Sequence, residues 1–279
     1  METGRASKTA LGVAIRRAAH QLVDQPPVLV DPIAVRLVGQ GHPRLMERAM
    51  HPVGRDFRAF MAVRSRYTED QLAAAVALSV TQYVVLGAGL DTFAYRNPFA
   101  ALRVFEVDFP ATQEGKRAML AEAGIAVPES LTFVPLDFEH HTLAEGLADA
   151  GFDARKPAFF GWLGVVPYLT LDAFRATLAA VARLPAGTAV SFDYAISPET
   201  LGAEGRKAFD RLADRVAAAG EPFQLFFTPE TMELELRRAG FQRIEQLDYE
   251  RLNELYFMDR EDGLKLSAVR LAMLVTAWV

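Results

Sequence analysis

The stretch Val84-Val85-Leu86-Gly87-Ala88-Gly89-Leu90-Asp91-Thr92 decides the fold. Its apolar start is typical of a strand buried on both faces, and the strand leads directly into two glycines separated by one alanine. Glycine permits a tight turn and lets a ligand approach the backbone closely. Ligands of open α/β sheets bind beyond the carboxyl ends of the strands, so this loop indicates a cofactor site. Taken alone, the loop also fits an ordinary strand-ending turn.

Apolar runs and helix-like segments alternate on the carboxyl side of this loop. Apolar runs lie at 83–86, 102–107, 131–136, 158–162 and 188–193, and helical segments at 110–123, 142–150 and 171–183. Helices are then expected at 197–220, capped by Ser197, and from Thr228 to Gly240, followed by strands at 241–248 and 267–277. This order predicts an α/β fold with a doubly wound, seven-stranded Rossmann-like sheet that ends in an antiparallel hairpin.

The first 80 residues lack strand patterns. Helices are expected at 7–23 and 55–79, with a short helix after Asp31-Pro32 and a loop at 41–54. Residues 1–80 are therefore interpreted as a helical N-terminal cap, and residues 81–279 as the core, with a lid insertion at about 194–230.

The composition excludes several classes of partner and site. The net charge of −5 gives no support for a nucleic-acid partner, which would need clustered Lys and Arg. The chain has no cysteine, which removes disulfides and thiol nucleophiles. Charged residues interrupt the first apolar segment, and no run reaches the ~20 apolar residues of a membrane span. The sequence thus predicts a cytoplasmic protein without a membrane partner.

An acidic residue ends the second predicted strand. Asp108 follows Gly89 by 19 residues, the spacing at which an acid accepts hydrogen bonds from ribose hydroxyls. Glu106 could share this role, and both acids could instead favour the helix that begins at Pro110. The third glycine of a dinucleotide loop is replaced by Thr92, which disfavours a nicotinamide cofactor.

Several blocks along the chain resemble the leucine carboxyl methyltransferase family, with greatest similarity to its bacterial branch, which includes polyketide carboxyl O-methyltransferases. The resemblance rests on the loop quoted above, on Phe105-Glu106-Val107-Asp108-Phe109-Pro110, on Arg64-Ser65-Arg66-Tyr67, and on the block from Trp162 to Thr170. It covers nearly the whole chain. It implies S-adenosylmethionine as methyl donor and S-adenosylhomocysteine as product.

The resemblance also implies which residues contact the donor. Arg66 matches the position that holds the donor carboxylate, with Arg64 close enough to be confused with it, and Asp108 matches the ribose ligand. Without the resemblance, we would expect Arg66 to form a salt bridge with Glu69 or Asp70. The full set of expected donor contacts is Arg64, Arg66, Gly87, Ala88, Gly89, Asp91, Glu106, Asp108, Asp137, Phe138 and Trp162.

One departure from the family pattern bears on the acceptor. Members that methylate a protein phosphatase carry Glu where this chain has Leu163, which argues against a protein chain end as acceptor. The leading hypothesis is an O-methyltransferase for a small, polyketide-like carboxylate or hydroxyl. A protein C-terminal carboxyl methyltransferase and a non-catalytic cofactor-binding protein are the alternatives. The oligomeric state stays open, with a homodimer as one option.

The acceptor is expected between the N-terminal cap and residues 194–230. Tyr168, Tyr194 and His51 are the candidate catalytic residues, and the scattered histidines predict no metal site. Three phenylalanines could either form a wall for a flat acceptor or pack a helix onto the sheet. They are Phe223, Phe226 and Phe227.

Overall fold

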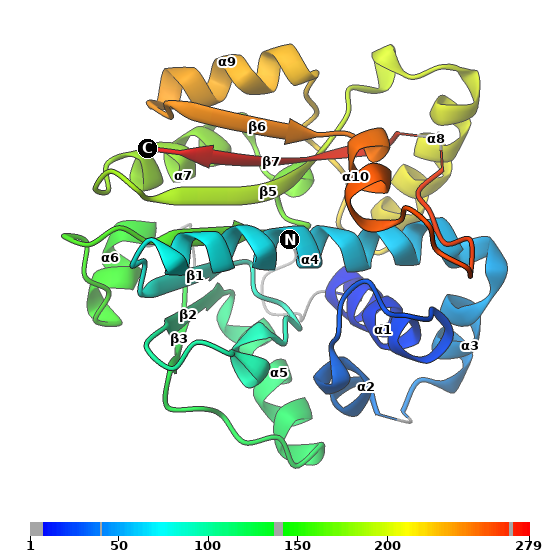
Figure 1. Cartoon of the computed structure of the whole chain (residues 1–279), viewed down its shortest axis with the longest axis horizontal. Helices are drawn as coiled ribbons and strands as arrows, with labels where there is room; N and C mark the ends of the chain where they lie inside the picture. Colours follow the sequence, from blue (N-terminus) through cyan, green and yellow to red (C-terminus); the bar gives the residue numbers. More distant parts are fainter. Residues whose placement is uncertain (1–7, 40, 137–141, 268–269) are drawn as a thin grey trace.

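The computed structural model describes residues 8–39, 41–136, 142–267 and 270–279. Seven strands form one sheet in the order β3-β2-β1-β4-β5-β7-β6 (Figure 1). The strands are β1 Gln82–Leu86, β2 Arg103–Asp108, β3 Leu131–Pro135, β4 Phe159–Trp162, β5 Ala189–Ala195, β6 Arg243–Leu247 and β7 Ala272–Trp278. Strands β1 to β5 pair in parallel, and β7 runs antiparallel between β5 and β6. The predicted doubly wound seven-stranded sheet is confirmed.

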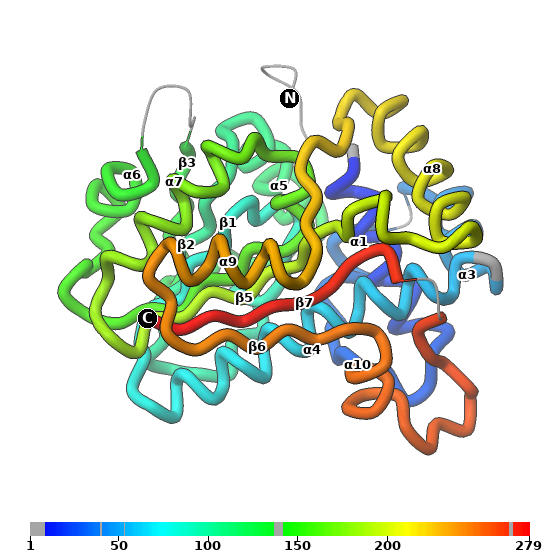
Figure 2. Tube along the Cα trace, turned by 90° about the horizontal axis from the view of Figure 1, so that it is seen from above, coloured from blue at the N-terminus to red at the C-terminus, as the bar shows by residue number. Residues whose placement is uncertain are grey.

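The helices cover both faces of this sheet. They are α1 Lys8–Val23, α2 Pro32–Val38, α3 Pro43–Met50, α4 Arg55–Ala77, α5 Pro110–Glu122, α6 Leu143–Asp149, α7 Leu171–Ala182, α8 Ala203–Ala218, α9 Pro229–Ala239 and α10 Tyr249–Tyr256. On β1, Val84 and Leu86 pack in a cluster with α6, α7 and α9, whereas Tyr83 and Val85 pack in a cluster with α4. Figure 2 shows α9 and α4 on opposite sides of the sheet.

The order of the strands fixes where a ligand can bind. From β1 the chain winds outward to β2 and β3, and it then returns to place β4 and β5 on the other side of β1. The connection after β1 and the connection after β4 therefore run to opposite sides of the sheet. The crevice between them, beyond the carboxyl ends of these two strands, is where open α/β sheets bind ligands. In Figure 1, α1, α2, α3 and α8 gather at this end of the sheet.

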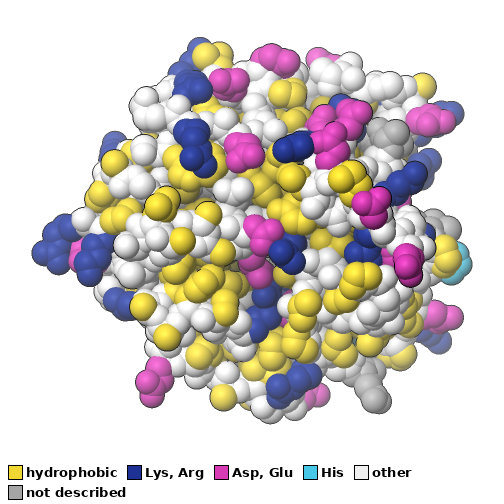
Figure 3. Space-filling view, viewed as in Figure 1, with side chains coloured by type: hydrophobic (Ala, Val, Ile, Leu, Met, Phe, Trp, Pro, Cys, Tyr) yellow, Lys and Arg dark blue, Asp and Glu magenta, His cyan; other side chains and the backbone are white. Residues whose placement is uncertain are grey.

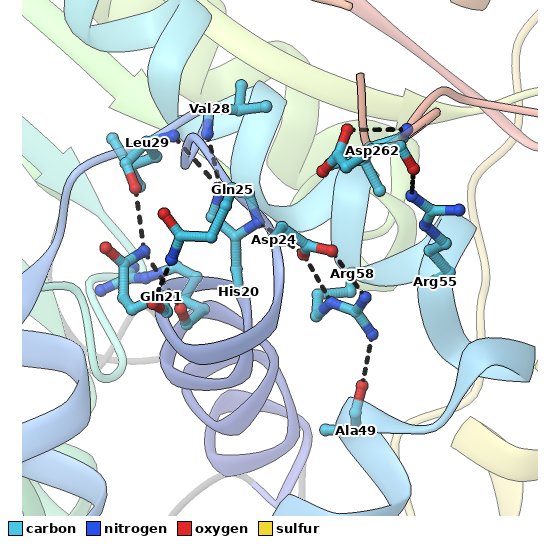
Figure 4. Close-up of polar contacts among 12 residues, drawn as sticks. His20, Gln21, Asp24, Gln25, Val28, Leu29, Ala49, Arg55, Arg58 and Asp262 are labelled. Carbon is cyan, nitrogen blue, oxygen red and sulfur yellow. Dashed lines mark hydrogen bonds and ion pairs between the residues drawn. The ribbon is translucent and has the colours of Figure 1, made fainter. Parts of the chain in front are cut away.

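A buried network fastens the N-terminal helices to one another (Figure 4). Asp24, which follows α1, accepts hydrogen bonds from Arg58 of α4 at 2.7 and 2.8 Å and contacts His20 Nδ1 at 2.8 Å. The backbone N–H of Val28 donates to His20 Nε2 at 2.8 Å, and Arg58 donates to the Ala49 carbonyl of α3 at 2.7 Å. Since Nε2 accepts a hydrogen bond here, it carries no proton in this arrangement, and Nδ1 is the nitrogen whose N–H donates to Asp24.

Two sequence-based predictions about elements are wrong. The expected loop at 41–54 contains α3, which Pro43 starts at its first position. The helix expected from Ser197 begins only at Ala203, because the extended Gly202 precedes it, and the Ser197 side chain forms no capping bond. The last two strands pair antiparallel as predicted, but their connection holds α10, which Asp248 starts by accepting a hydrogen bond from the Arg251 N–H at 2.9 Å.

Candidate functional site

The glycine loop after β1 is fastened to the end of β2. Gly87 and Gly89 adopt φ values of 64° and 48°, which glycine reaches without strain. The Gly87 N–H donates to the Val107 carbonyl at 2.8 Å, and the Gly89 N–H donates to Asp108 Oδ2 at 2.5 Å. The two halves of the predicted nucleoside site, the loop and the acid, are thus joined directly by a hydrogen bond.

Val165 occupies the space that a side chain at position 87 would need. A Cβ at this position would lie 2.4 Å from Val165 Cγ2. We expect Gly87→Ala to lower the free energy of unfolding by more than the ~1–2 kcal/mol that a left-handed residue with a Cβ typically costs. Gly124→Ala is the matched control, because Gly124 has a φ of 62° and no atom within 4 Å of its Cβ position. Equal losses for the two variants in urea denaturation would show that the contact with Val165 contributes nothing.

Asp108 faces the cavity, and Glu106 does not. Both Asp108 oxygens accept backbone hydrogen bonds, from Gly89 and from Phe109 at 2.7 Å, and burial raises the pKa of Asp108 despite these bonds. Glu106, which is buried, pairs with Lys116 of α5 at 2.6 Å. Burial raises the pKa of Glu106 to about 7, although Lys116 opposes the shift. Because its carboxylate is paired with Lys116 and does not line the cavity, the structure does not bring Glu106 to the expected donor site.

Asp91 of the loop is held by an arginine that sequence reasoning missed. Arg17 of α1 donates to Asp91 at 3.2 Å and to Thr92 at 2.7 Å, and it lies 3.0 Å from Asp31. Arg17 is buried and its ion pairs bring α1 against the glycine loop. No local spacing could reveal this residue, since 74 positions separate it from Asp91.

The arginine that reaches the cavity is Arg64. Arg64 is buried and donates to Asp193 at 2.9 Å, while Asp193 also accepts from the Gly164 N–H at 2.6 Å. Arg66 is instead solvent-exposed and pairs with Asp70 at 2.9 Å. Two residues along a helix point about 200° apart, so these side chains leave α4 on nearly opposite sides. Of the two arginines expected to contact the donor, the structure brings Arg64 to the cavity and leaves Arg66 at the surface.

The candidate catalytic residues have different positions. Tyr168 lines the cavity, and burial followed by the charge of Glu221 raises its pKa to about 12. Tyr194 lines the cavity as well, but its hydroxyl donates to Gln246 at 2.6 Å. His51 follows α3 and is not among the lining residues, so the structure does not bring this candidate base to the cavity.

Trp162, another expected donor contact, is not among the lining residues. Its side chain is buried and stacks on Phe174, with ring centroids 5.7 Å apart. Its neighbours Gly161 and Leu163 line the cavity instead, because successive side chains of a strand point to opposite faces. Asp137 and Phe138 lie outside the described residues.

One cavity of about 680 Å³ joins these groups. Ala88 lines it with the two glycines, and Phe209, Leu212 and Val216 of α8 add apolar side chains to the lining. Phe223 lines this cavity, whereas Phe227 packs in the core against Phe174, with ring centroids 5.1 Å apart. Among the described residues no group of three potential metal ligands is found. No helix in the same ranges is long and apolar enough to cross a membrane.

Comparison with known proteins decides the family. Residues 10–182 match the leucine carboxyl methyltransferase model. The chain belongs to the leucine carboxyl methyltransferase family. It is 32% identical to the "Putative S-adenosyl-L-methionine-dependent methyltransferase YktD" of Bacillus subtilis strain 168, over 95% of each chain. A Mycolicibacterium paratuberculosis protein with the same description, without the name YktD, is 35% identical over 58% of this chain and 55% of its own length.

Two solved structures share the whole fold of this family member. A DUF574 protein from Streptomyces avermitilis has a TM-score of 0.60 at 15% identity, with 99% of this chain and 98% of that chain covered. A structure titled a putative methyltransferase from Thermobifida fusca has a TM-score of 0.58 at 18% identity, with 99% and 96% covered. The protein is an S-adenosylmethionine-dependent methyltransferase.

The residues of the cavity fit this donor. The glycine turn brings backbone within reach of a ligand, and the Asp108 carboxylate beside it retains lone pairs for hydroxyl groups. Arg64 supplies a buried guanidinium whose Nε has no hydrogen-bond partner in the described part of the chain. The Nε atoms of Arg17 and Arg96 are in the same state. Arg64 lines the cavity beside Gly164. A guanidinium in that place fits an oxyanion such as the donor's amino-acid carboxylate.

Proposed function

We propose that the protein transfers the donor methyl group to an oxygen of a small, largely apolar acceptor of the natural-product type, such as a polyketide acid. In this proposal Asp108 binds the ribose hydroxyls, the loop from Gly87 to Gly89 contacts the nucleoside, and Arg64 binds the donor carboxylate. Ala88 and Asp91 support the loop from either side. The segment 194–230 acts as the lid of the acceptor chamber.

The observation that carries the proposal is the continuity of the cavity. The same hollow that includes Gly87 and Asp108 extends to Phe57, Phe209 and Phe223 without an intervening wall. Its volume of about 680 Å³ lies within the range typical of small-molecule sites. Phe209 comes from α8 and Phe57 from α4, so the chamber lies between the cap and the lid segment.

The chemistry of the lining favours an acceptor that is already ionised. The donor sulfonium supplies an activated methyl group, so the protein has to align the acceptor and exclude water. With a pKa of about 12, Tyr168 stays a neutral phenol and can donate a hydrogen bond, but it accepts no proton at neutral pH. A carboxylate needs no base, which makes it the preferred acceptor.

A hydroxyl acceptor is the second candidate, because of Glu221. This carboxylate lines the chamber beside Tyr168 and accepts a hydrogen bond from Thr9. It could take the proton of a hydroxyl acceptor during transfer. A protein chain end fits less well, since Leu163 gives the cavity an apolar wall and the Thr9–Glu221 bond links α1 to the segment after α8.

The proposal also places the enzyme in the cytoplasm, without a nucleic-acid or membrane partner. A net charge of −5 and the absence of cysteine support this view. On the face seen in Figure 3, basic and acidic side chains are interspersed and do not separate by sign.

Methyl transfer from S-adenosylmethionine with a tritiated methyl group tests the proposal. We expect label in one or more members of a panel of aromatic and long-chain carboxylic acids and phenols. Alkali should release the label as methanol, because it hydrolyses methyl esters and leaves aryl ethers intact. Alkali-stable label would favour the hydroxyl candidate. Label that enters peptides with a free C-terminal carboxylate, and no small molecule, would refute the proposal.

A further inference from the structure

The charges that line the cavity are not all paired. Among the described residues, each carboxylate of the lining has a partner: Asp91 pairs with Arg17, Asp193 with Arg64, Asp108 accepts from Gly89, and Glu221 accepts from Thr9. The lining also contains Arg16 and Arg215. Neither of these two arginines forms an ion pair within the part of the chain that the structure describes.

Arg16 lies in a place that is unfavourable for a cation. Its guanidinium donates to the Gly12 carbonyl at 2.7 Å and lies over the Phe57 ring, 4.7 Å from the centroid. Burial, followed by the positive charges of Arg215 and Arg48, lowers the pKa of Arg16 to about 10. Arg16 therefore stays charged at neutral pH, and like charges from α1, α3 and α8 meet there. An anion between Arg16 and Arg215 would remove this repulsion.

Helix α1 connects Arg16 to the donor loop. Ala10, near the start of this helix, lies beside the loop, since a Cβ built on Gly89 would be 3.2 Å from the Ala10 Cβ. The Arg16 side chain turns back toward that end of the helix, because its guanidinium donates to the Gly12 carbonyl at 2.7 Å. A group bound by Arg16 therefore lies in the same cavity as the donor loop.

We propose that Arg16 and Arg215 together bind an anionic group of the acceptor, such as a carboxylate. This inference rests on the proposed function and names its substrate class: an acid with an apolar body. The apolar body contacts Phe57 and Phe209, which line the same cavity. Arg215 belongs to α8, so the bound anion also holds the lid against α1.

Binding of a matched pair of probes tests this inference. The probes are 2-naphthoate and its uncharged analogue 2-naphthamide, titrated by calorimetry into the full-length protein with and without saturating S-adenosylhomocysteine. We expect naphthoate to bind about tenfold more tightly or better, because hydrogen bonds to charged groups contribute about 1.5–3 kcal/mol. Arg16→Gln and Arg215→Gln should each abolish most of this preference and leave the affinity for S-adenosylhomocysteine unchanged.

Arg206→Gln is the matched control, because Arg206 lies on the same helix as Arg215 but pairs with the exposed Asp210 and does not line the cavity. It should keep the preference for naphthoate. Equal affinity of the wild-type protein for both probes, or a preference that survives Arg215→Gln, would overturn the inference. Failure of the protein to bind S-adenosylhomocysteine would instead refute the proposed function. The naphthoate and naphthamide titrations made without S-adenosylhomocysteine would still decide the role of the two arginines. Arg215 is exposed, so its replacement leaves the fold intact.

Discussion

Replacing Asp24 with alanine is expected to lower the free energy of unfolding by about 3–5 kcal/mol, the usual loss when a buried ion pair loses one partner. The Asp24 side chain is 2% exposed and accepts two hydrogen bonds from Arg58 and one from His20. Without Asp24, the guanidinium of Arg58 stays buried and, among the described residues, keeps only the Ala49 carbonyl as a partner. Because folded domains are stable by only about 5–15 kcal/mol, this loss would be visible as a large shift of the urea midpoint.

The control for this variant is Asp210→Ala. Asp210 pairs with Arg206 on the surface of α8, with both side chains about half exposed. Exposed pairs of this kind contribute about 0–1 kcal/mol, so the urea midpoint should hardly change. A loss for Asp24→Ala as small as that of the control would contradict the view that this network fastens the N-terminal helices.

The pH dependence of the same variant gives a second measurement. Burial raises the pKa of Asp24, but hydrogen bonds from Arg58 and His20 outweigh it and lower the pKa to about 2. Since this carboxyl has a pKa of about 3.9 in the unfolded chain, the folded protein binds its proton more weakly than the unfolded chain does. The stabilisation by Asp24 is therefore complete above about pH 4 and is lost as the pH falls to about 2. The stability difference between wild type and Asp24→Ala should narrow over that interval.

Replacing Asp108 with alanine is expected to weaken S-adenosylhomocysteine binding by about 1–3 kcal/mol. Two causes act together. The variant removes the carboxylate that we assign to the ribose hydroxyls, and it leaves the Gly89 N–H without its acceptor. The turn after β1 then loses a bond to the end of β2, although Gly87 still donates to the Val107 carbonyl.

A graded variant separates these two causes. In Asp108→Asn the amide oxygen can still accept from Gly89, but the charge is lost and only one oxygen is left. We expect an affinity between those of the wild type and Asp108→Ala. The titrations are accompanied by urea denaturation, because a variant that is simply unfolded would lose binding for another reason. Wild-type affinity in a folded Asp108→Ala protein would rule out the assignment to the ribose.

Local sequence was sufficient for the centre of the site. The spacing from Gly89 to Asp108 predicts their meeting, because parallel neighbours β1 and β2 end side by side. The choice between Arg64 and Arg66 needed more, since the phase of α4 relative to the sheet decides which of them is buried. That phase depends on the packing of α4 against β4 and β5. Two arginines separated by a single residue do not show which of them faces the sheet.

Contacts between distant segments explain the remaining differences. Arg16 and Arg215 belong to helices far apart in the sequence, and neither has a local pattern that marks it as part of a cavity. His51 was predicted as a catalytic candidate only because residues 41–54 were expected to form a loop. In the structure α3 occupies that range, and His51 at its C-terminal end is not among the lining residues. Tertiary packing thus decides which side chains line the cavity under α8, while motif spacing predicts the meeting of Gly89 and Asp108.

A crystal structure of the protein with S-adenosylhomocysteine tests the central claim most directly. We predict the two ribose hydroxyls within hydrogen-bond distance of the Asp108 carboxylate, the nucleoside against the turn from Gly87 to Gly89, and the amino-acid carboxylate at Arg64. A complex in which the ligand binds elsewhere, with Asp108 still turned only to the Gly89 and Phe109 amides, would contradict the account.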